Sequence, residues 1–444
     1  MMDKYVITGG NPLHGEVCVS GAKNVAMKVI LCGLLTEKNI TVSNIPLISS
    51  VYGTARIVEK LGVKVSIERY THRLTLKGNG MRDFIVPFEI GGVYRSASMV
   101  LGPLLARLGH ARVPNPGGCR IGKRPIDRHI DGLKAMGAVI SYREGYFEAD
   151  APRGLKGTTY TFVSNTHTGT ETLILAGVLA KGKTILKNAA EEPEIDDLIS
   201  LLNQMGAHIK RTAKKTILIE GVSELQGADF SIMPDRNEVV TFAIAALSTG
   251  GDVRIVGAQK KYLTTFLNAL TAIGASWQEV EKDKIRFFSK YPYKATHITT
   301  GAYPAFMTDW QAPWAILANY CGGVSTIHET VYENRFSYVE ELRKMGADIH
   351  FFSPKISNPS LVYNFNWSDK RKDYHQAIEV KGIAKLHNAV LEVSDLRAGA
   401  TLVLAALTAQ GESVIYGIDH IDRGYENLEG RLQSLGAKIV RKKE

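Results

Sequence analysis

The sequence predicts an α/β protein of two globular domains, each built from three copies of one small helix-and-strand unit. Two recurring patterns lead to this prediction. A short tag of an apolar residue, glycine and a small residue recurs along the chain. A second tag, a helix-like stretch that stops at glycine or asparagine before a β-branched strand, precedes each copy of the first. Such recurrence is the signature of internal structural repeats.

The first tag marks the end of a helix and the start of a strand. Glycine is the usual residue where the backbone turns left-handed after a helix. Successive tag glycines are 68 to 90 residues apart. The copies are Leu61-Gly62-Val63, Met136-Gly137-Ala138, Met205-Gly206-Ala207, Ile273-Gly274-Ala275, Met345-Gly346-Ala347 and Leu435-Gly436-Ala437.

The second tag joins an Ala- and Leu-rich helix to a strand through a short polar step. Apolar and polar residues alternate after the step, as they do in a half-buried strand. The copies cover residues 34–45, 105–115, 178–188, 246–257, 317–329 and 407–417.

A second amphipathic helix is expected between the two tags. Apolar residues recur at helical spacing in residues 124–136 and again in residues 334–345. Each unit therefore reads helix, strand, helix, strand. A solenoid is the alternative, but its repeats usually span about 20–45 residues. Six units grouped three and three fit better, with the boundary near residue 233.

Composition excludes several classes of protein. The chain has 444 residues, 45% of them hydrophobic and 22% charged, which rules out wholesale disorder. Its four cysteines are too few for a disulfide scaffold and lack the CxxC spacing of a zinc site. No secretory signal and no apolar run of about 20 residues is visible, so a cytoplasmic protein is expected. The net charge of +10 calls for anionic partners: nucleic acid, a membrane surface or small anions.

Residues 20–24, Ser-Gly-Ala-Lys-Asn, combine a glycine turn with a lysine at the start of a helix. Helix N-termini with such neighbours bind anions. The plainer interpretation is a capped helix with a solvated lysine.

A proline- and glycine-rich loop, residues 114–125, carries Cys119 beside Arg120, Lys123 and Arg124. Cationic neighbours favour a thiolate, so this cysteine is a functional candidate. The other cysteines stand in apolar strand or helix contexts and are expected to be small buried hydrophobes. They are Cys18, Cys32 and Cys321.

Charged residues also stand at the edges of apolar helices, where solvation is incomplete. Any one of them could belong to a structural ion pair. Several arginines in equivalent loops of both halves instead favour a cationic cleft for a multiply charged small anion. The residues are Arg95, Asp309, Arg335, Asp395, Arg397 and Arg423.

These motifs resemble the family of UDP-N-acetylglucosamine 1-carboxyvinyltransferases, enolpyruvyl transferases of the EPSP synthase superfamily, over essentially the whole chain. The most specific matches are PGGCRIGKRPIDRHIDGL, PAFMTDWQ, ETVYENRF, SDLRAGATLVLA and HIDRGYENLEG. The resemblance implies two inverse α/β barrels of βαβαββ units. It places the domains at 22–233, with the cysteine loop, and at 1–21 with 234–444. The active site is then expected in a cleft between them.

The resemblance also implies a reaction, in which the enolpyruvyl group of phosphoenolpyruvate moves to the 3′-hydroxyl of UDP-N-acetylglucosamine and phosphate leaves. Cys119 would be the general acid and the target of fosfomycin, and Asp309 the base. Loop 114–124 would act as a lid. Lys23, Arg124 and Arg423 would hold phosphoenolpyruvate, and Arg95 and Arg397 would line the cleft. The expected catalytic residues are Cys119, Asp309, Lys23, Arg397 and Arg423.

The expected substrate-binding set is wider. It comprises Lys23, Asn24, Arg95, Arg124, Pro125, Asp127, His129, Arg236, Asp309, Arg335 and Val331. No metal and no cofactor is expected, because cations of the chain would neutralise the substrate charge. The expected partners are the two small-molecule substrates, without nucleic acid or membrane.

Three segments depart from the family pattern. Pro46 lacks the lysine that usually follows it, and residues 164–170 differ from the family loop that touches the nucleotide diphosphate. Residues 354–387 form an extra-long connection, expected to be a solvated insertion.

Other functions were weighed against the resemblance. The shikimate-pathway enolpyruvyl transferase shares the cosubstrate but lacks the cysteine loop. A relative of RNA 3′-phosphate cyclases would need stacking aromatics and a continuous basic stripe, whereas many arginines here stand singly. A silent paralogue is disfavoured by the intact set of Cys119, Asp309, Lys23 and Arg423.

Overall fold

The computed structural model describes residues 3–117, 121–123 and 125–443, and its chain divides into two compact units. The cysteine loop was expected with residues 22–233, whereas its described residues 121–123 group with the other unit. That each unit is an independent domain stays a prediction. Unit 1 comprises Met1–Ser20, Cys119–Arg124 and Pro234–Glu444, and unit 2 comprises Gly21–Gly118 and Pro125–Met233.

The sheets of unit 1 share one strand order. In each, a parallel pair is extended by antiparallel strands. Short strands β19 (Phe306–Met307), β17 (Tyr293–Lys294) and β20 (Cys321–Gly322) lie beside them. The orders are β2 (His14–Cys18), β14 (Asp252–Val256), β16 (Lys284–Phe288), β15 (Ser276–Glu281); β18 (His297–Gly301), β21 (Val324–His328), β23 (Ala377–Lys381), β22 (Asp348–Phe352); and β24 (Val390–Glu392), β25 (Glu412–Tyr416), β1 (Lys4–Thr8), β26 (Lys438–Lys442).

Unit 2 repeats that strand order. In its three-stranded sheet, which contains β6, an isolated parallel bridge from Ile85 to Arg112 replaces the first strand. Recurrence of one sheet in both units confirms the repeats expected from the tags. The orders are β13 (Ala228–Ser231), β3 (Asn39–Ser43), β5 (Arg73–Lys77), β4 (Lys64–Glu68); β6 (His110–Pro114), β8 (Tyr146–Asp150), β7 (Val139–Arg143); and β9 (Thr159–Thr161), β10 (Lys183–Lys187), β12 (Thr216–Glu220), β11 (His208–Ala213).

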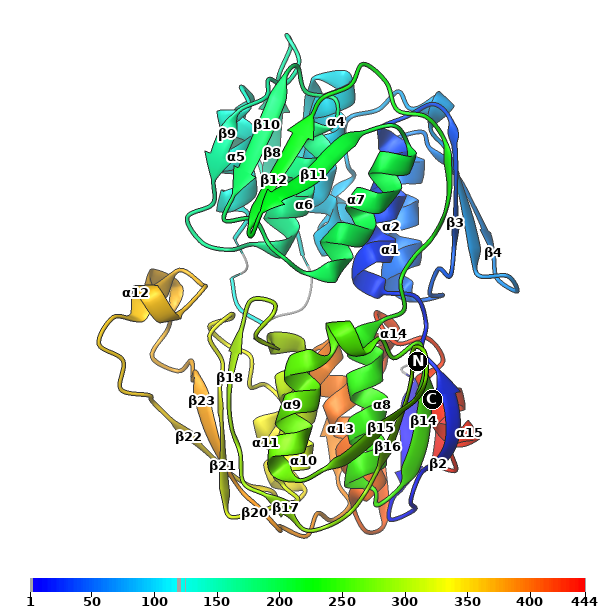
Figure 1. Cartoon of the computed structure of the whole chain (residues 1–444), viewed down its shortest axis with the longest axis vertical. Helices are drawn as coiled ribbons and strands as arrows, with labels where there is room; N and C mark the ends of the chain where they lie inside the picture. Colours follow the sequence, from blue (N-terminus) through cyan, green and yellow to red (C-terminus); the bar gives the residue numbers. More distant parts are fainter. Residues whose placement is uncertain (1–2, 118–120, 124, 444) are drawn as a thin grey trace. The chain divides into compact units, whose positions relative to one another are not determined.

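Each repeat contributes an inner helix and an outer helix. Every residue of α8 and α10 is buried, so these helices are covered on all sides, as their nearly continuous apolar sequence requires. Figure 1 shows the helices of each unit inside and the sheets around them, as in an inverse α/β barrel. Inner and outer helices, in pairs, are α1 (Lys23–Leu31) and α2 (Ser49–Lys60), α4 (Leu101–Leu108) and α5 (Asp127–Ala135), α6 (His167–Gly177) and α7 (Pro193–Gln204), α8 (Arg236–Ser248) and α9 (Thr264–Ile273), α10 (Gln311–Ala318) and α11 (Val339–Lys344), and α13 (Leu396–Thr408) and α15 (Leu428–Ser434).

The tag glycines end the outer helices as expected. Each has a left-handed backbone, with φ between +82° and +99°. A side chain would strain this conformation, which explains why the same residue recurs at the same place in every copy. Short helices α3 (Phe88–Gly91), α12 (Pro359–Val362) and α14 (Asp419–Asp422) lie outside the pairs. None of the helices in the described ranges combines the length and apolar character that a bilayer span requires.

Two expectations about local structure were wrong in part. The helix expected over 334–345 begins only at Val339, although Phe336 is buried beside it. The connection 354–387 is not solvated throughout, because β23 lies within it and pairs with both β21 and β22. Ala377, Ile378 and Val380 are buried there. The part between β22 and β23 is residues 353–376, and residues 382–387 follow β23.

Asp197 in α7 holds the end of unit 2 and makes the stability of the unit dependent on pH. Its carboxylate accepts a hydrogen bond from the backbone N–H of Met233 (3.0 Å). Burial raises the pKa of Asp197 to about 6, and that hydrogen bond opposes the rise only in part. The folded chain therefore binds this proton more tightly than the unfolded chain, whose aspartate pKa is about 4.

An Asp197→Asn variant is expected to be more stable than the parent above pH 6, by roughly 2–3 kcal/mol. Stability of the parent falls as the pH rises from about 4 to 6, because the folded state must then release a proton that the unfolded state has already lost. Asparagine keeps the acceptor for Met233 and carries no charge. Urea unfolding at pH 4 and pH 7.5 checks this. An equal effect at both pH values would contradict it.

Candidate active site

Asp309 is the centre of an ionic cluster in unit 1. It lies in a single 3₁₀ turn, Thr308–Trp310, that leads from β19 into α10. Its two carboxylate oxygens contact different arginines: Oδ1 accepts a hydrogen bond from Arg335, and Oδ2 lies 3.4 Å from Nη2 of Arg397. The side chain of Asp309 is 21% exposed, while those of the arginines are 6% and 8% exposed. The carboxylate is therefore the accessible member of the cluster.

Arg335 is fixed by a chain of hydrogen bonds that ends at a buried acid. Its Nη1 donates to Thr308 Oγ1 (2.7 Å), and that hydroxyl donates to Glu329 Oε2 (2.7 Å). Burial alone would lower the pKa of Arg335, but Asp309 and Glu329 raise it above its usual value, so the guanidinium stays charged. Burial raises the pKa of Glu329, although Arg335 and the hydrogen bond from Thr308 oppose the rise.

Glu329 also shapes the loop that contains Val331. Its Oε1 accepts hydrogen bonds from the backbone N–H groups of Val331 (2.7 Å) and Tyr332 (3.0 Å). The ring of Tyr332 then lies 5.0 Å from the guanidinium carbon of Arg335. One buried carboxylate thus orders both a loop and an arginine.

Arg397 is held at the start of α13. Asp395 caps this helix by accepting hydrogen bonds from the N–H groups of Arg397 and Ala398. Arg397 Nη1 donates to Tyr425 Oη (2.8 Å), and that hydroxyl is bonded to Thr241 of α8 (2.7 Å). Burial would lower the pKa of Arg397, but Tyr425 and Asp309 raise it, so this guanidinium also stays charged.

Two further arginines expected in the site are placed differently. Arg236 begins α8 and is buried against aromatic rings, 4.9 Å from Tyr303 and 5.7 Å from Trp310. Its contacts suit a structural cation–π role. Arg423 follows α14, which packs on α13. Within the described residues, no hydrogen bond or ion pair joins Arg423 to the Asp309 cluster.

Residues 121–123 of the cysteine loop group with unit 1. Ile121 is buried. The backbone N–H of Lys123 donates to Glu333 Oε1 (2.5 Å), and its ammonium donates to Asp369 Oδ1 (2.7 Å). Cys119 and Arg124 lie outside the described residues.

In unit 2 the expected substrate residues gather at helix starts. Lys23 and Asn24 open α1, and Asp127 opens α5. Arg95 donates a hydrogen bond to the carbonyl of Pro125 (3.1 Å). The structure therefore brings the arginine of one motif to the proline of another, as a shared site would require.

His129 is enclosed in α5 rather than presented at a surface. It is 1% exposed, and its Nε2 is bonded to Thr168 Oγ1 (3.0 Å) at the start of α6. Burial, aided by Arg95 and Arg128, lowers the pKa of His129 to about 3. The imidazole is therefore neutral at physiological pH. Arg128 bonds to the carbonyl of Asn165 (3.1 Å), so α5 also supports the divergent loop 164–170.

Sequence reasoning missed several residues of these networks. Glu329, Thr308 and Tyr425 stand inside quoted motifs but were not singled out. Unit 2 also holds a buried ionic triad, Lys28 with Glu171 and His167. The visible signal for that triad was a charged residue within an apolar helical run, as in VAMKVIL and TETLILAG.

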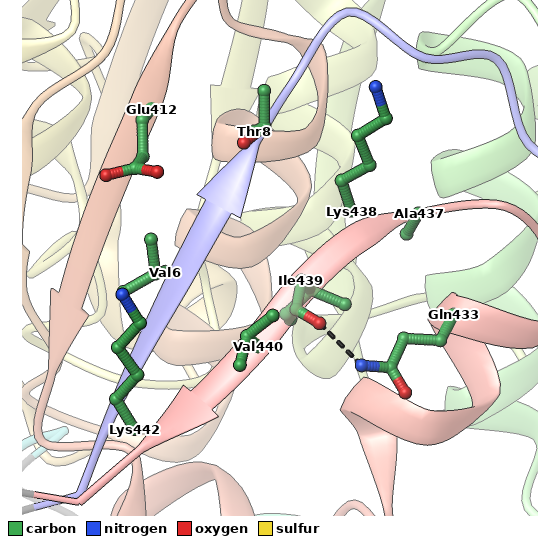
Figure 2. Close-up of a pocket in the computed structure, with 9 residues that line it drawn as sticks. All are labelled: Val6, Thr8, Glu412, Gln433, Ala437, Lys438, Ile439, Val440 and Lys442. Carbon is green, nitrogen blue, oxygen red and sulfur yellow. Dashed lines mark hydrogen bonds between the residues drawn. The ribbon is translucent and has the colours of Figure 1, made fainter.

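The described residues contain no group of three or more histidine, cysteine, aspartate or glutamate side chains suited to a metal ion. A surface pocket of about 380 Å³ lies on the sheet that contains β1 and β26 (Figure 2). Its lining includes Val6, Glu412 and Lys438, and Gln433 spans its edge by a hydrogen bond to the carbonyl of Ile439 (2.6 Å). None of the site residues expected from the sequence lines this pocket.

Comparisons with known proteins point to one family. The family model described as EPSP synthase (3-phosphoshikimate 1-carboxyvinyltransferase) matches residues 7–432. A UDP-N-acetylglucosamine 1-carboxyvinyltransferase from Acidobacterium capsulatum is 42% identical over 99% of this chain and 96% of its own length. One from Trichlorobacter lovleyi is 41% identical over the full length of both chains.

Solved structures give the same fold. The enolpyruvyl transferase NikO from Streptomyces tendae has a TM-score of 0.86 at 23% identity, over 99% of both chains. The EPSP synthase from Acinetobacter baumannii has a TM-score of 0.72 at 19% identity, over 99% of this chain and all of its own. At these identities the likeness bears on the fold alone, and it agrees with the inverse α/β barrel.

Proposed function

Because the chain belongs to the EPSP synthase family and, within it, to the UDP-N-acetylglucosamine 1-carboxyvinyltransferases, we propose that it transfers the enolpyruvyl group of phosphoenolpyruvate to the 3′-hydroxyl of UDP-N-acetylglucosamine. The observation that carries the proposal is 41–42% identity to curated relatives over nearly the full length of each chain. The product would serve peptidoglycan synthesis, and we place the reaction in the cytoplasm.

The reaction is an addition followed by an elimination. The sugar oxygen bonds to C2 of phosphoenolpyruvate, its proton passes to a base, and an acid protonates C3. The C2–O bond to phosphate then breaks, and C3 gives up a proton to restore the double bond. Atoms and charge balance without a redox step or a cofactor. The chain must therefore supply a base, an acid and cations for a phosphate and a carboxylate.

Asp309 is proposed as the base at the sugar hydroxyl. It is the accessible acid of the unit 1 cluster, and its carboxylate is held between two buried guanidinium groups. Arg397 and Arg335 fix its orientation. Such fixed geometry matters because a base acts only within hydrogen-bond reach of the proton that it removes.

Lys23 and Arg423 are proposed to hold the anionic groups of phosphoenolpyruvate, and Arg95 and Arg397 to line the substrate site. Arginine suits this task because its planar fork binds phosphate or carboxylate through two hydrogen bonds. Cys119 is proposed as the acid at C3 and Arg124 as a further phosphate ligand. Both assignments rest on the family resemblance of the motif PGGCRIGKRP.

The substrate-binding set is retained as part of the proposal, with a supporting role for Arg236, which packs against aromatic rings, and a distinct role for His129. Its neutral, buried imidazole is not placed to exchange protons with a ligand. We assign it the task of holding Thr168, and with it the start of α6. Asn24, Pro125, Asp127 and Val331 remain proposed substrate contacts.

Phosphate release decides between the proposed substrate and its nearest alternative. The protein is expected to release phosphate from phosphoenolpyruvate when UDP-N-acetylglucosamine is present and not when shikimate 3-phosphate replaces it. Fosfomycin is expected to stop the release, and a Cys119→Ala variant to show almost none. Turnover with shikimate 3-phosphate alone would refute the proposed substrate. Full activity of the Cys119→Ala variant would refute the proposed acid.

A further inference from the structure

The connection between β22 and β23, residues 353–376, is largely exposed but is anchored to the rest of unit 1 through Tyr363. Tyr363 is 5% exposed, and its hydroxyl is bonded to His328 Nε2 (3.1 Å). The next residue, Asn364, donates its backbone N–H to the carbonyl of Thr330 (2.8 Å). The ring of Trp367 stacks on Tyr363, with centroids 4.7 Å apart and planes 14° apart. These contacts anchor the connection beside the loop ordered by Glu329.

The same connection carries an acid that reaches the cysteine loop. Asp369 ends the 3₁₀ turn Trp367–Asp369, only two residues after the stacked tryptophan. Its side chain is 16% exposed, and its Oδ1 accepts a hydrogen bond from the ammonium of Lys123 at 2.7 Å. The aromatic stack thus anchors the turn that carries this carboxylate.

A second acid binds the same loop through its backbone. Glu333 is 2% exposed, and it accepts the backbone N–H of Lys123 at 2.5 Å. Its carboxyl group lies so close to Gly122 that a Cβ there would be 2.4 Å away. Gly122 also has φ +134°, which side chains rarely tolerate. Glu333 and Asp369 therefore both bind Lys123, Glu333 through its backbone N–H and Asp369 through its ammonium.

We propose that Asp369 and Glu333 are positioning residues for the cysteine loop, and that the connection 353–376 is present in this chain to supply the first of them. The proposal rests on the proposed function, because the loop matters for catalysis only if Cys119 acts. Lys123 stands four residues after Cys119. The glycines give this loop many conformations, and two fixed anchors at its end reduce them.

A positioning role for Asp369 and an ordinary surface salt bridge predict different effects on kcat. An exposed salt bridge contributes little to folding stability, and the side chain of Lys123 is 55% exposed. Loss of the pair is therefore expected to leave the melting temperature nearly unchanged. A positioning role instead predicts a loss in kcat, since a misplaced catalytic group slows the chemical step without weakening substrate binding to the same degree.

The test is a double-mutant cycle on Lys123→Met and Asp369→Asn. Each single variant is expected to lower kcat by roughly 3- to 10-fold with little change in KM, and the double variant to be no worse than either. Asp373→Asn is the matched control, because Asp373 is an exposed acid of the same connection. Its kcat is expected to stay within about 2-fold of the parent. Losses that multiply in the double variant, or an equal loss in the control, would overturn the proposal.

Reversing the charges of both partners tests whether kcat can be restored. Asp369→Lys alone is expected to reduce kcat more than Asp369→Asn, because two ammonium groups then repel. Adding Lys123→Glu to Asp369→Lys is expected to recover much of the loss. Failure of the paired reversal to improve on the single variant would count against the pairing.

A second readout separates this proposal from the proposed reaction. Alkylation of Cys119 by iodoacetamide, followed for its own peptide by mass spectrometry, needs no substrate. The Lys123→Met and Asp369→Asn variants are expected to shift its rate by a common factor of roughly 3 or more. Cys18 serves as internal reference, because it is exposed, contrary to the expectation that it is buried like Cys32 and Cys321. Unchanged alkylation of Cys119 in both variants would overturn the positioning role whether or not enolpyruvyl transfer is observed.

Discussion

Replacing Asp309 by asparagine is expected to lower kcat by about 10²- to 10⁴-fold, the usual contribution of a general base. Asparagine keeps the size of the side chain and one acceptor oxygen, but it cannot take the proton of a sugar hydroxyl. It also removes the negative charge that lies between Arg335 and Arg397. Steady-state kinetics with both substrates varied would measure the effect.

The division between kcat and KM identifies the role of Asp309. If the carboxylate only kept the two arginines in place, asparagine would raise KM for the anionic substrate and largely spare kcat. Asp348→Asn is the control, because Asp348 is a part-exposed acid of the same unit that pairs with Lys381. A kcat for Asp309→Asn within about 3-fold of the parent would refute the assignment as a base.

Replacing Glu171 by glutamine is expected to destabilise unit 2 by about 3–5 kcal/mol, since it leaves a buried lysine without its counter-charge. Glu171 is fully buried, its Oε2 lies 3.2 Å from Lys28 Nζ, and its Oε1 lies 3.1 Å from His167 Nε2. Neither oxygen meets the geometry of a hydrogen bond. Electrostatic attraction therefore stabilises this triad more than hydrogen bonds do. Glu171 raises the pKa of His167 although burial opposes this.

A second variant tests whether the loss comes from the uncompensated charge. Lys28→Met combined with Glu171→Gln removes both buried charges and is expected to recover at least half of the stability. Lys183→Met is the control, because Lys183 forms an exposed pair with Glu220 in the same unit. It is expected to lose less than about 1 kcal/mol. A double variant less stable than Glu171→Gln would contradict the explanation.

The positions of the tryptophans allow an experiment to show which unit the Glu171→Gln variant destabilises. Trp277, Trp310, Trp314 and Trp367 all belong to unit 1, and together they are every tryptophan in the chain. Tryptophan fluorescence therefore follows unit 1, whereas far-UV circular dichroism follows both units. In urea, the Glu171→Gln variant is expected to shift the circular dichroism transition more than the fluorescence transition. Equal shifts would place the loss outside unit 2 or show that the two units unfold together.

The repeats could be predicted from the sequence because their signals are local. A tag glycine is required by the backbone angle at its own position, and an amphipathic helix shows its period within a dozen residues. Strand β23 was missed for the opposite reason. Its five alternating residues, AIEVK, follow a long polar segment, and only pairing with β21 and β22 shows that they are central in a sheet.

The sequence predicted which residues belong to the site, but not which of them form hydrogen bonds and ion pairs with one another. Asp309, Arg335 and Arg397 were identified as charged residues at helix edges and through the resemblance. That one carboxylate joins both arginines, although they stand 26 and 88 residues away, depends on the packing of α10 against α13. The pairing of Lys123 with Asp369 spans 246 residues and involves a segment interpreted as solvated. No local pattern in the sequence predicts a contact between residues so far apart.

The strand order of the last repeat sets a sequence of events during synthesis. β1 lies between β25 and β26, so its hydrogen-bond partners are residues 412–416 and 438–442. The ribosome makes β1 first and its neighbours last. An unpaired strand with buried Tyr5 and Ile7 is a template for wrong pairing. Until β25 and β26 have been synthesised, this strand is therefore without its native partners, and in that interval it favours aggregation.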